Sequence, residues 1–184
     1  MPRSIFRAAV LVLLLRGVML AAEPGGVWLD IPFVKQEKNG CGAASIAMVM
    51  QYWQQQLGEP VSSFADSVQI LHALRADTTR EIYASEMERY FQQNGYRTFE
   101  FSGEWTLLKQ QLGKGRPLIA ALKPGSSREL HYVVVAGLDE ENKVVLLNDP
   151  AQRKLLKEDT FRFEQEWKAT ANWTLLAVPE MSSH

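Results

Sequence analysis

The amino-acid sequence predicts an α+β domain in which a helical first half packs against a mostly antiparallel β-sheet formed by the second half. The first observation is that apolar residues recur at helical spacing through most of the chain up to about residue 95. The second is that short runs rich in valine, leucine and isoleucine then alternate with turn-forming stretches such as PGSS and DEEN. The third is length: 184 residues with an apolar N-terminal segment leave about 160 residues, enough for one domain.

The first 22 residues have the layout of a secretory signal peptide. Arg3 and Arg7 give a positive start, the stretches AAVLVLLL and GVMLAA are apolar, and LAAEPGG offers small residues before a polar exit. An uncleaved N-terminal membrane anchor is the alternative. Cleavage would export residues 23–184 as a single periplasmic or extracellular domain. Because it would remove three arginines and no acidic residue, it would shift the formal net charge from −1 to −4.

The composition of the remaining chain argues against two classes of partner. It is mildly acidic and has no basic cluster, which is atypical of a protein that binds nucleic acid. It has no second long apolar stretch, so we expect no membrane span in the mature chain.

The first half is predicted to contain an entry strand and three helices. The strand covers residues 27–36 (VWLDIPFVKQ), with Pro32 interrupting regular pairing. The helices are expected at about 42–55, where Ile46, Val49, Met50 and Trp53 share a face, at 61–72 with Ser62 or Ser63 as N-cap, and within 83–96 with Ser85 as N-cap and Asn94-Gly95 as the stop.

The second half is predicted to be mostly strands. They are expected at 96–101, 116–123, 131–139, 143–150 and 173–179, with short helices at 104–115 and about 157–167. A site formed where the two halves meet would draw one group from the helices and others from the sheet.

The only cysteine, Cys41, lies at the predicted start of the first long helix, between Gly40 and Gly42. A single cysteine rules out a disulfide framework within the chain. A helix N-terminus favours the thiolate, which is the nucleophilic form, and the two glycines allow a sharp turn and close approach of a substrate backbone. The alternative is that Cys41 is a buried small hydrophobic residue, the commonest role of a free cysteine.

A nucleophilic thiol needs a general base that is oriented by a third group. Of the three histidines, His184 is the last residue and His72 is expected on a helix surface, which leaves His131. The short DEEN turn predicts a hairpin of strands 131–138 and 143–149, so His131, at the start of one strand, lies beside Asp149, at the end of the next. The alternatives are a solvated histidine at a strand end and an Asp-Pro turn residue.

Gln36 is the fourth candidate residue. It lies five residues before Cys41, in the loop that leads to the helix. A side-chain amide there could join the Cys41 backbone N–H in binding an oxyanion. The alternative is that Gln36 is an ordinary solvent-exposed loop residue, which is the commoner role of a single glutamine in a loop.

These segments together resemble the bacteriocin-processing cysteine peptidases and their stand-alone relatives, family thirty-nine of the papain-like clan. The similarity covers about residues 28–179 and rests on Gln36, NGCGAASIAMVMQYW, GKGRPLIAAL, HYVVVAGLD and LNDPA. The resemblance implies a papain-like fold in which Cys41 is the nucleophile, His131 the base and acid, Asp149 the orienting residue and Gln36 the oxyanion donor. In the best-known members this domain is fused to an exporter and cuts leader peptides after Gly-Gly. Because this chain has its own export signal, we expect an envelope or secreted peptide as substrate.

Three functional hypotheses follow. The first is a thiol peptidase that acts on a peptide or protein substrate. The second is amide transfer at the same site, which an added amine that captures the acyl-enzyme would reveal. The third is a non-catalytic peptide-binding module, which would keep its ligand when Cys41 is replaced by alanine. We expect no metal and no cofactor, because the histidines are scattered and GKG at 113–115 lacks the rest of a phosphate-binding loop.

Overall fold

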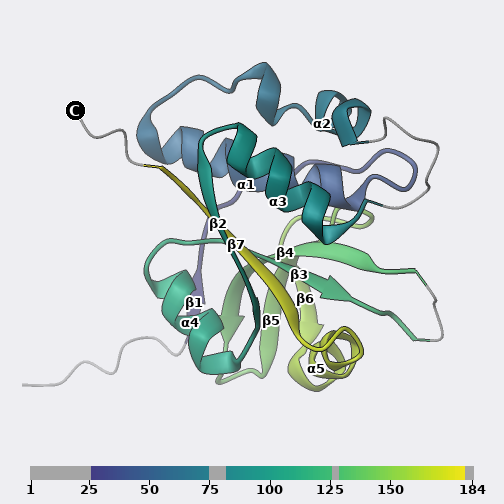
Figure 1. Ribbon diagram of the computed structural model, residues 1–184. Coiled ribbons are helices and arrows are strands. Elements are labelled where there is room, and N and C mark those ends of the chain that lie inside the picture. Colours follow the sequence, from purple (N-terminus) through teal and green to yellow (C-terminus); the bar gives the residue numbers. More distant parts are fainter. Residues whose placement is uncertain (1–25, 75–81, 126–128, 181–184) are drawn as a thin grey trace, which may run out of the picture.

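The computed structural model describes residues 26–74, 82–125 and 129–180, so the predicted signal peptide lies outside the described residues. Within these ranges the protein is a seven-stranded antiparallel sheet with helices on both faces (Figure 1), which confirms the predicted α+β class. The strands are β1 (Gly26–Trp28), β2 (Tyr96–Ser102), β3 (Leu118–Leu122), β4 (His131–Asp139), β5 (Val144–Asn148), β6 (Leu156–Asp159) and β7 (Trp173–Pro179). The strand order is β2-β7-β3-β4-β5-β6, and β1 pairs with β4.

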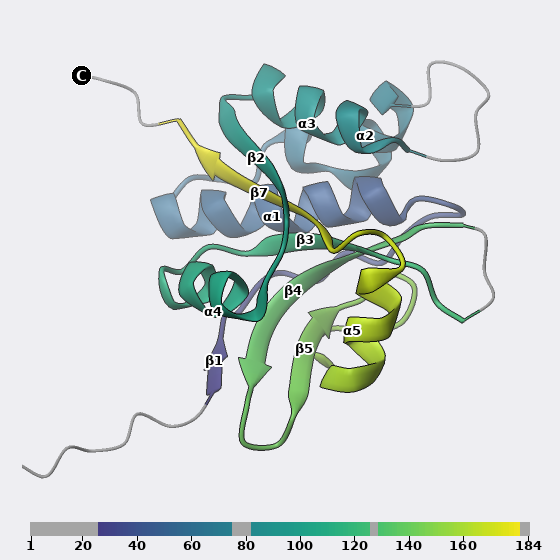
Figure 2. The same ribbon diagram turned by 60° about the horizontal axis from the view of Figure 1, so that its bottom comes forward.

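Five α-helices and one 3-10 turn are present in the described ranges. They are α1 (Cys41–Leu57), the 3-10 turn Ser63–Ala65, α2 (Ser67–Leu74), α3 (Ala84–Gln93), α4 (Trp105–Gly113) and α5 (Thr160–Lys168). Helix α1 covers one face of the sheet with α2 and α3 outside it, whereas α4 and α5 lie on the opposite side (Figures 1 and 2). In these ranges no helix combines the length and the apolar character that crossing a bilayer requires.

Strand β4 lies at the centre of this arrangement. Its residues Tyr132, Val134 and Ala136 pack into the core under α1, while Val133 and Val135 pack into the core that α4 and α5 cover. A strand buried on both faces reads as a continuous apolar run rather than as an alternation, which explains the sequence HYVVVAGLD. The start of β4 is therefore held rigidly from both sides.

The predicted entry strand is wrong beyond Trp28. Residues 29–40 form an irregular segment, in which the Leu29 N–H still bonds the Ala136 carbonyl at 2.8 Å and Ile31 is fully buried. Pro32 has no N–H to offer a neighbouring strand, so regular pairing cannot continue there. This segment carries Gln36 toward the start of α1.

Helix boundaries differ from the prediction at three places. The region 61–72 is not one helix but the 3-10 turn followed by α2, and the Asp66 carboxylate caps α2 by accepting from the Val68 and Gln69 N–H groups at 3.1 and 2.9 Å. Helix α3 is capped at Tyr83 rather than Ser85, since the Glu86 carboxylate accepts from the Tyr83 N–H at 3.0 Å.

The third difference lies before α5. Residues 156–159 form strand β6 against β5, and α5 begins only at Thr160, with the Asp159 carboxylate accepting from the N–H groups of Phe161 and Arg162. Lys157 and Glu158 look helical by composition, but their pairing with β5 is a tertiary contact that local propensity does not report.

Gly137 allows the close approach of β1 to β4. The β4–β5 register shifts between Val135 and Gly137, and a Cβ on Gly137 would lie 2.6 Å from the Val27 carbonyl oxygen and 2.7 Å from the Trp28 Cβ. We therefore expect Gly137→Ala to displace β1 and to lower the free energy of unfolding by about 1–3 kcal/mol. Urea unfolding of the variant and the wild type measures this.

Gly113→Ala is the matched control, because a Cβ there meets nothing within 4 Å and its φ is not in the left-handed region. It lies in the last turn of α4, where alanine is a better helix former than glycine, so its stability should stay equal or rise. Equal losses in the two variants would contradict the steric explanation.

Candidate active site

Cys41 is the first residue of α1, and Gly40 is its N-cap. No side chain caps this end of the helix, and its first turn contains no acidic residue, so the positive end of the helix dipole acts on the Cys41 side chain. Cys41 is partly exposed. Ile82 lies directly against Gly42, the next residue. A Cβ at position 42 would be only 3.2 Å from the Ile82 side chain.

The structure places His131 beside Asp149, as the predicted hairpin requires. Strands β4 and β5 pair antiparallel with Val134 opposite Asn148, and His131 Nε2 lies 2.8 Å from Asp149 Oδ1. The Cys41 side chain lies in the same pocket, near enough to this imidazole to influence its pKa. Because Asp149 occupies Nε2, the ring nitrogen that remains for the thiol is Nδ1.

The electrostatics of this group favour a charged imidazole. Burial disfavours the charge on His131, but the hydrogen bonds to Asp149 and Cys41 and the negative charge of these partners outweigh it and raise the pKa of His131 to about 9. Burial also disfavours the charge on the Asp149 carboxyl, and on its own it would raise the pKa of that group. Its hydrogen bond to His131 and the charge of that ring, followed by the bonds from Ala151 and Gln152, instead hold this pKa below its usual range.

Gln152 is a residue of this site that the sequence analysis missed. Its Nε2 donates to Asp149 Oδ2 at 2.6 Å, while the Ala151 N–H donates to Asp149 Oδ1 at 2.9 Å. Both carboxylate oxygens of Asp149 therefore have donors from its own turn in addition to His131. A glutamine three residues after an aspartate is too common in turns to have been recognised from sequence.

Gln36 is tied to the turn that carries Asp149. Its backbone N–H donates to the Pro150 carbonyl at 2.9 Å. Asn148, fully buried and also missed by the sequence analysis, donates from Nδ2 to the Ile31 carbonyl at 3.1 Å and accepts at Oδ1 from the Leu155 N–H at 2.9 Å. These bonds join the segment before α1 to the turn after β5.

All four predicted residues are thus in one region, and three of them line one pocket of about 170 Å³. Gln36, Cys41 and His131 line it, together with Asn39, Gly42, Ile82, Tyr83, Glu129, Leu130 and Tyr132, and Asp149 contacts His131. Gln36 Oε1 is buried without a hydrogen-bond partner among the described residues. Of the other two histidines, His72 is exposed on α2, and His184 lies outside the described residues.

No group of three or more histidine, cysteine, aspartate or glutamate side chains in the described ranges is arranged to hold a metal ion. A partly exposed thiol at a helix N-terminus, near an imidazole that is itself hydrogen-bonded to a carboxylate, is instead an arrangement that can perform nucleophilic chemistry.

The chain is similar to known proteins in both sequence and structure. The sequence model of the Peptidase C39-like family matches residues 28–174. A C39-like protein from Bacillus anthracis has a similar structure, with a TM-score of 0.62 at 18% identity over 84% of this chain and 98% of that one. Among curated protein sequences, none matches the chain.

Two further solved structures are similar. The peptidase domain of Streptococcus ComA, a bifunctional ABC transporter involved in quorum sensing, has a TM-score of 0.60 at 21% identity and covers 80% of this chain and 98% of its own. A double-glycine-motif protease from an AMS/PCAT transporter, solved with the leader peptide, has a TM-score of 0.62 at 20% identity and covers 83% of this chain and 94% of its own. At these identities the similarity establishes the fold.

The raised pKa of His131 makes stability depend on pH. A histidine with a pKa near 6.5 when unfolded and about 9 when folded stabilises the protein fully below about pH 6.5, and that contribution is lost as the pH rises through 9. We expect His131→Ala to be less stable than the wild type by a margin that is larger at pH 6 than at pH 9.5. Urea unfolding at several pH values measures it, with Gln165→Ala as the control, because Gln165 is exposed on α5 and carries no titratable group. A margin that grows with pH would contradict the raised pKa.

The bond from Gln152 predicts a shift in the titration of Asp149. Gln152→Ala removes a donor to the charged carboxylate, so the pKa of Asp149 should rise. Carbon NMR of the Asp149 carboxyl measures the shift. Gln165→Ala is the control, because Gln165 is exposed on α5 and its side chain has no hydrogen bond to a described residue. If the Asp149 titration is the same in both variants, the Gln152 bond is absent in solution.

Proposed function

This chain belongs to the C39-like peptidase family, and on that premise we propose that it is a cysteine peptidase in which Cys41 is the nucleophile. The observation that carries the proposal is the set of three neighbouring side chains: Cys41 at a helix N-terminus, His131 in the same pocket, and Asp149 at 2.8 Å from His131 Nε2. The position of Cys41 supports the same assignment, since the N-terminus of a helix favours the nucleophilic form of a thiol.

In the proposed reaction the Cys41 proton passes to His131, and the thiolate attacks the carbonyl carbon of a peptide bond. The C–N bond then breaks, and His131 returns the proton to the leaving amine, which leaves a thioester on Cys41. His131 next takes a proton from water, the hydroxide attacks the thioester, and the carboxylic acid product departs as the thiolate reforms. Asp149 keeps Nε2 protonated, and so presents Nδ1 to the thiol throughout.

Gln36 is assigned to the oxyanion that develops on the carbonyl oxygen. Its side chain lines the pocket that contains Cys41, and its backbone is held by the Pro150 carbonyl. An amide donor held in place before the reaction stabilises the oxyanion without having to reorganise, and the Cys41 backbone N–H is the second donor. Removing one such donor costs about 100- to 1,000-fold in rate in known enzymes.

The substrate is proposed to be a peptide, which agrees with the leader peptide bound to the double-glycine-motif protease of similar fold. We include export in the proposal, with residues 1–22 as the signal peptide. An exported domain meets oxidising surroundings, and the lack of a second cysteine leaves Cys41 without an intramolecular disulfide partner.

Alkylation by iodoacetamide across pH tests the activated thiol, and it is specific because Cys41 is the only cysteine. An ordinary thiol, with a pKa near 8.5, is only about 1% thiolate at pH 6.5. We therefore expect the purified protein to react at pH 6.5 up to about 100-fold faster than an ordinary thiol, and His131→Ala to lose this advantage.

His72→Ala is the matched control, because His72 is exposed on α2 away from the pocket, and it should react like the wild type. Cys41→Ala should not react at all. An alkylation profile that follows an ordinary thiol would overturn the peptidase assignment and favour a peptide-binding module.

A further inference from the structure

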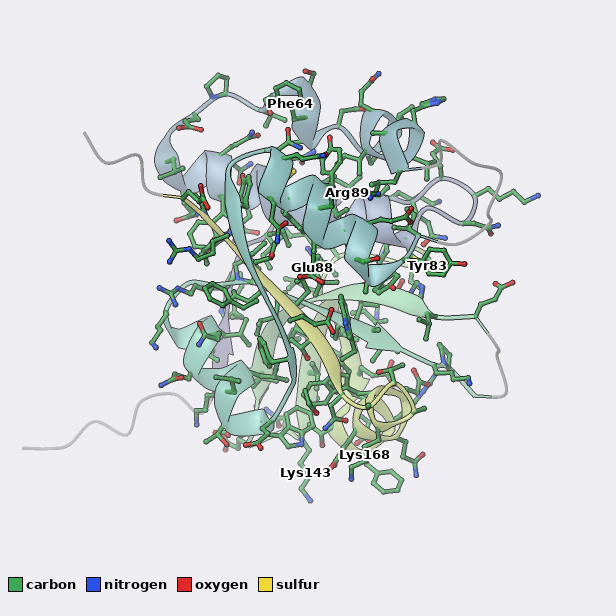
Figure 3. All side chains as sticks on the ribbon, viewed as in Figure 1. Phe64, Tyr83, Glu88, Arg89, Lys143 and Lys168 are labelled. Carbon is green, nitrogen blue, oxygen red and sulfur yellow. The ribbon has the colours of Figure 1, made fainter. Side chains whose placement is uncertain are left out.

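Two exposed apolar side chains stand at the mouth of the pocket that contains Cys41. Tyr83, at the cap of α3, is 56% exposed, and Leu130, immediately before β4, is 42% exposed. Figure 3 shows Tyr83 at the start of α3, on the side of the molecule where β4 begins. They come from different segments of the chain, and both line the pocket.

The side chains beneath them are apolar, and their positions are fixed. Ile82 and Tyr132 line the same pocket and are only 5% and 4% exposed. Tyr132 packs edge-on against Trp173, with ring centroids 5.5 Å apart, and Ile82 lies against the position where Gly42 lacks a side chain. Two apolar residues that line the pocket are therefore held in place by the surrounding core.

The location of these two residues separates them from ordinary surface hydrophobic residues. Phe161, for example, is 67% exposed on α5 and lines none of the described pockets. Single exposed apolar residues need no explanation, whereas apolar residues that converge on a concave site with a few polar groups are typical of ligand pockets.

We propose that Tyr83 and Leu130 form an apolar subsite that holds one bulky apolar side chain of the substrate next to the scissile bond. This inference rests on the proposed function and names its substrate class: peptides with a leucine- or phenylalanine-like residue beside the cleaved bond. The pocket as a whole measures about 170 Å³, and because a cavity of about 150 Å³ is enough to bind benzene, it has room for one such side chain.

Alkylation by iodoacetamides that differ in their N-substituent tests the subsite without a known substrate. N-benzyl iodoacetamide carries an aromatic ring a few atoms from the sulfur that it alkylates, so the ring can reach the pocket walls. The measured quantity is its rate relative to plain iodoacetamide, divided by the same ratio for free glutathione. Burial of a side chain of this size predicts a ratio of about 10- to 100-fold for the wild type.

Two pairs of variants assign the effect to the subsite. Tyr83→Ala and Leu130→Ala should each lower the ratio severalfold, whereas Tyr83→Phe and Leu130→Met, which keep an apolar group of similar volume, should preserve it. Phe161→Ala is the matched control for the loss of an exposed apolar side chain and should leave the ratio unchanged.

The outcomes separate this inference from the proposed function. A wild-type ratio near one, or a ratio that neither alanine variant changes, or one that Phe161→Ala lowers equally, overturns the subsite. The rate with plain iodoacetamide reports the activated thiol on its own. A fast reaction with plain iodoacetamide and an N-benzyl ratio near one therefore contradicts the subsite alone. A slow reaction with plain iodoacetamide and a high N-benzyl ratio contradicts the peptidase assignment and leaves an apolar binding pocket.

Discussion

The antiparallel pairing of β4 with β5 is the constraint on which the site depends. It brings His131, the first residue of β4, beside Asp149, the residue that follows β5. The pairing thus sets the 2.8 Å contact between His131 Nε2 and Asp149 Oδ1. Because β4 is buried on both faces, the backbone at His131 is held between two cores. A short turn and a buried apolar strand thus fix the position of the imidazole.

A second set of bonds attaches the helical half to this hairpin. Asn148 bonds the segment before α1 through the Ile31 carbonyl, and the Pro150 carbonyl holds the Gln36 N–H. Cys41, at the start of α1, is the residue of the helical half that lies near the imidazole. The placement of α1 on the sheet therefore sets the position of Cys41 relative to His131. Unlike the hairpin, these bonds join segments more than 100 residues apart in sequence, and they form only when the two halves have packed.

This difference explains what could be predicted from the sequence. The class of fold, the helix at Cys41 and the proximity of His131 to Asp149 follow from local signals: apolar periodicity, glycine placement and a short turn. Asn148 and Gln152 could not be found, because hydrogen-bond partners of a buried amide or of a turn carboxylate are set by tertiary contacts. The strand β6 was mistaken for helix for the same reason, since its partner decides its conformation.

The proposed apolar subsite also bears on the electrostatics beside it. Burial already opposes the charge on His131, and only the partners Asp149 and Cys41 reverse that effect. A substrate side chain bound between Tyr83 and Leu130 would displace water from the same pocket and lower the local dielectric constant. In the proposed mechanism this would strengthen the attraction between imidazolium and thiolate, and it would also increase the cost of burying each charge. In the proposed mechanism the imidazolium remains favourable, because Asp149 has donors on both oxygens and keeps its charge. The bonds that hold Asp149 ionised are therefore what would allow an apolar subsite to lie directly against the proposed catalytic residues.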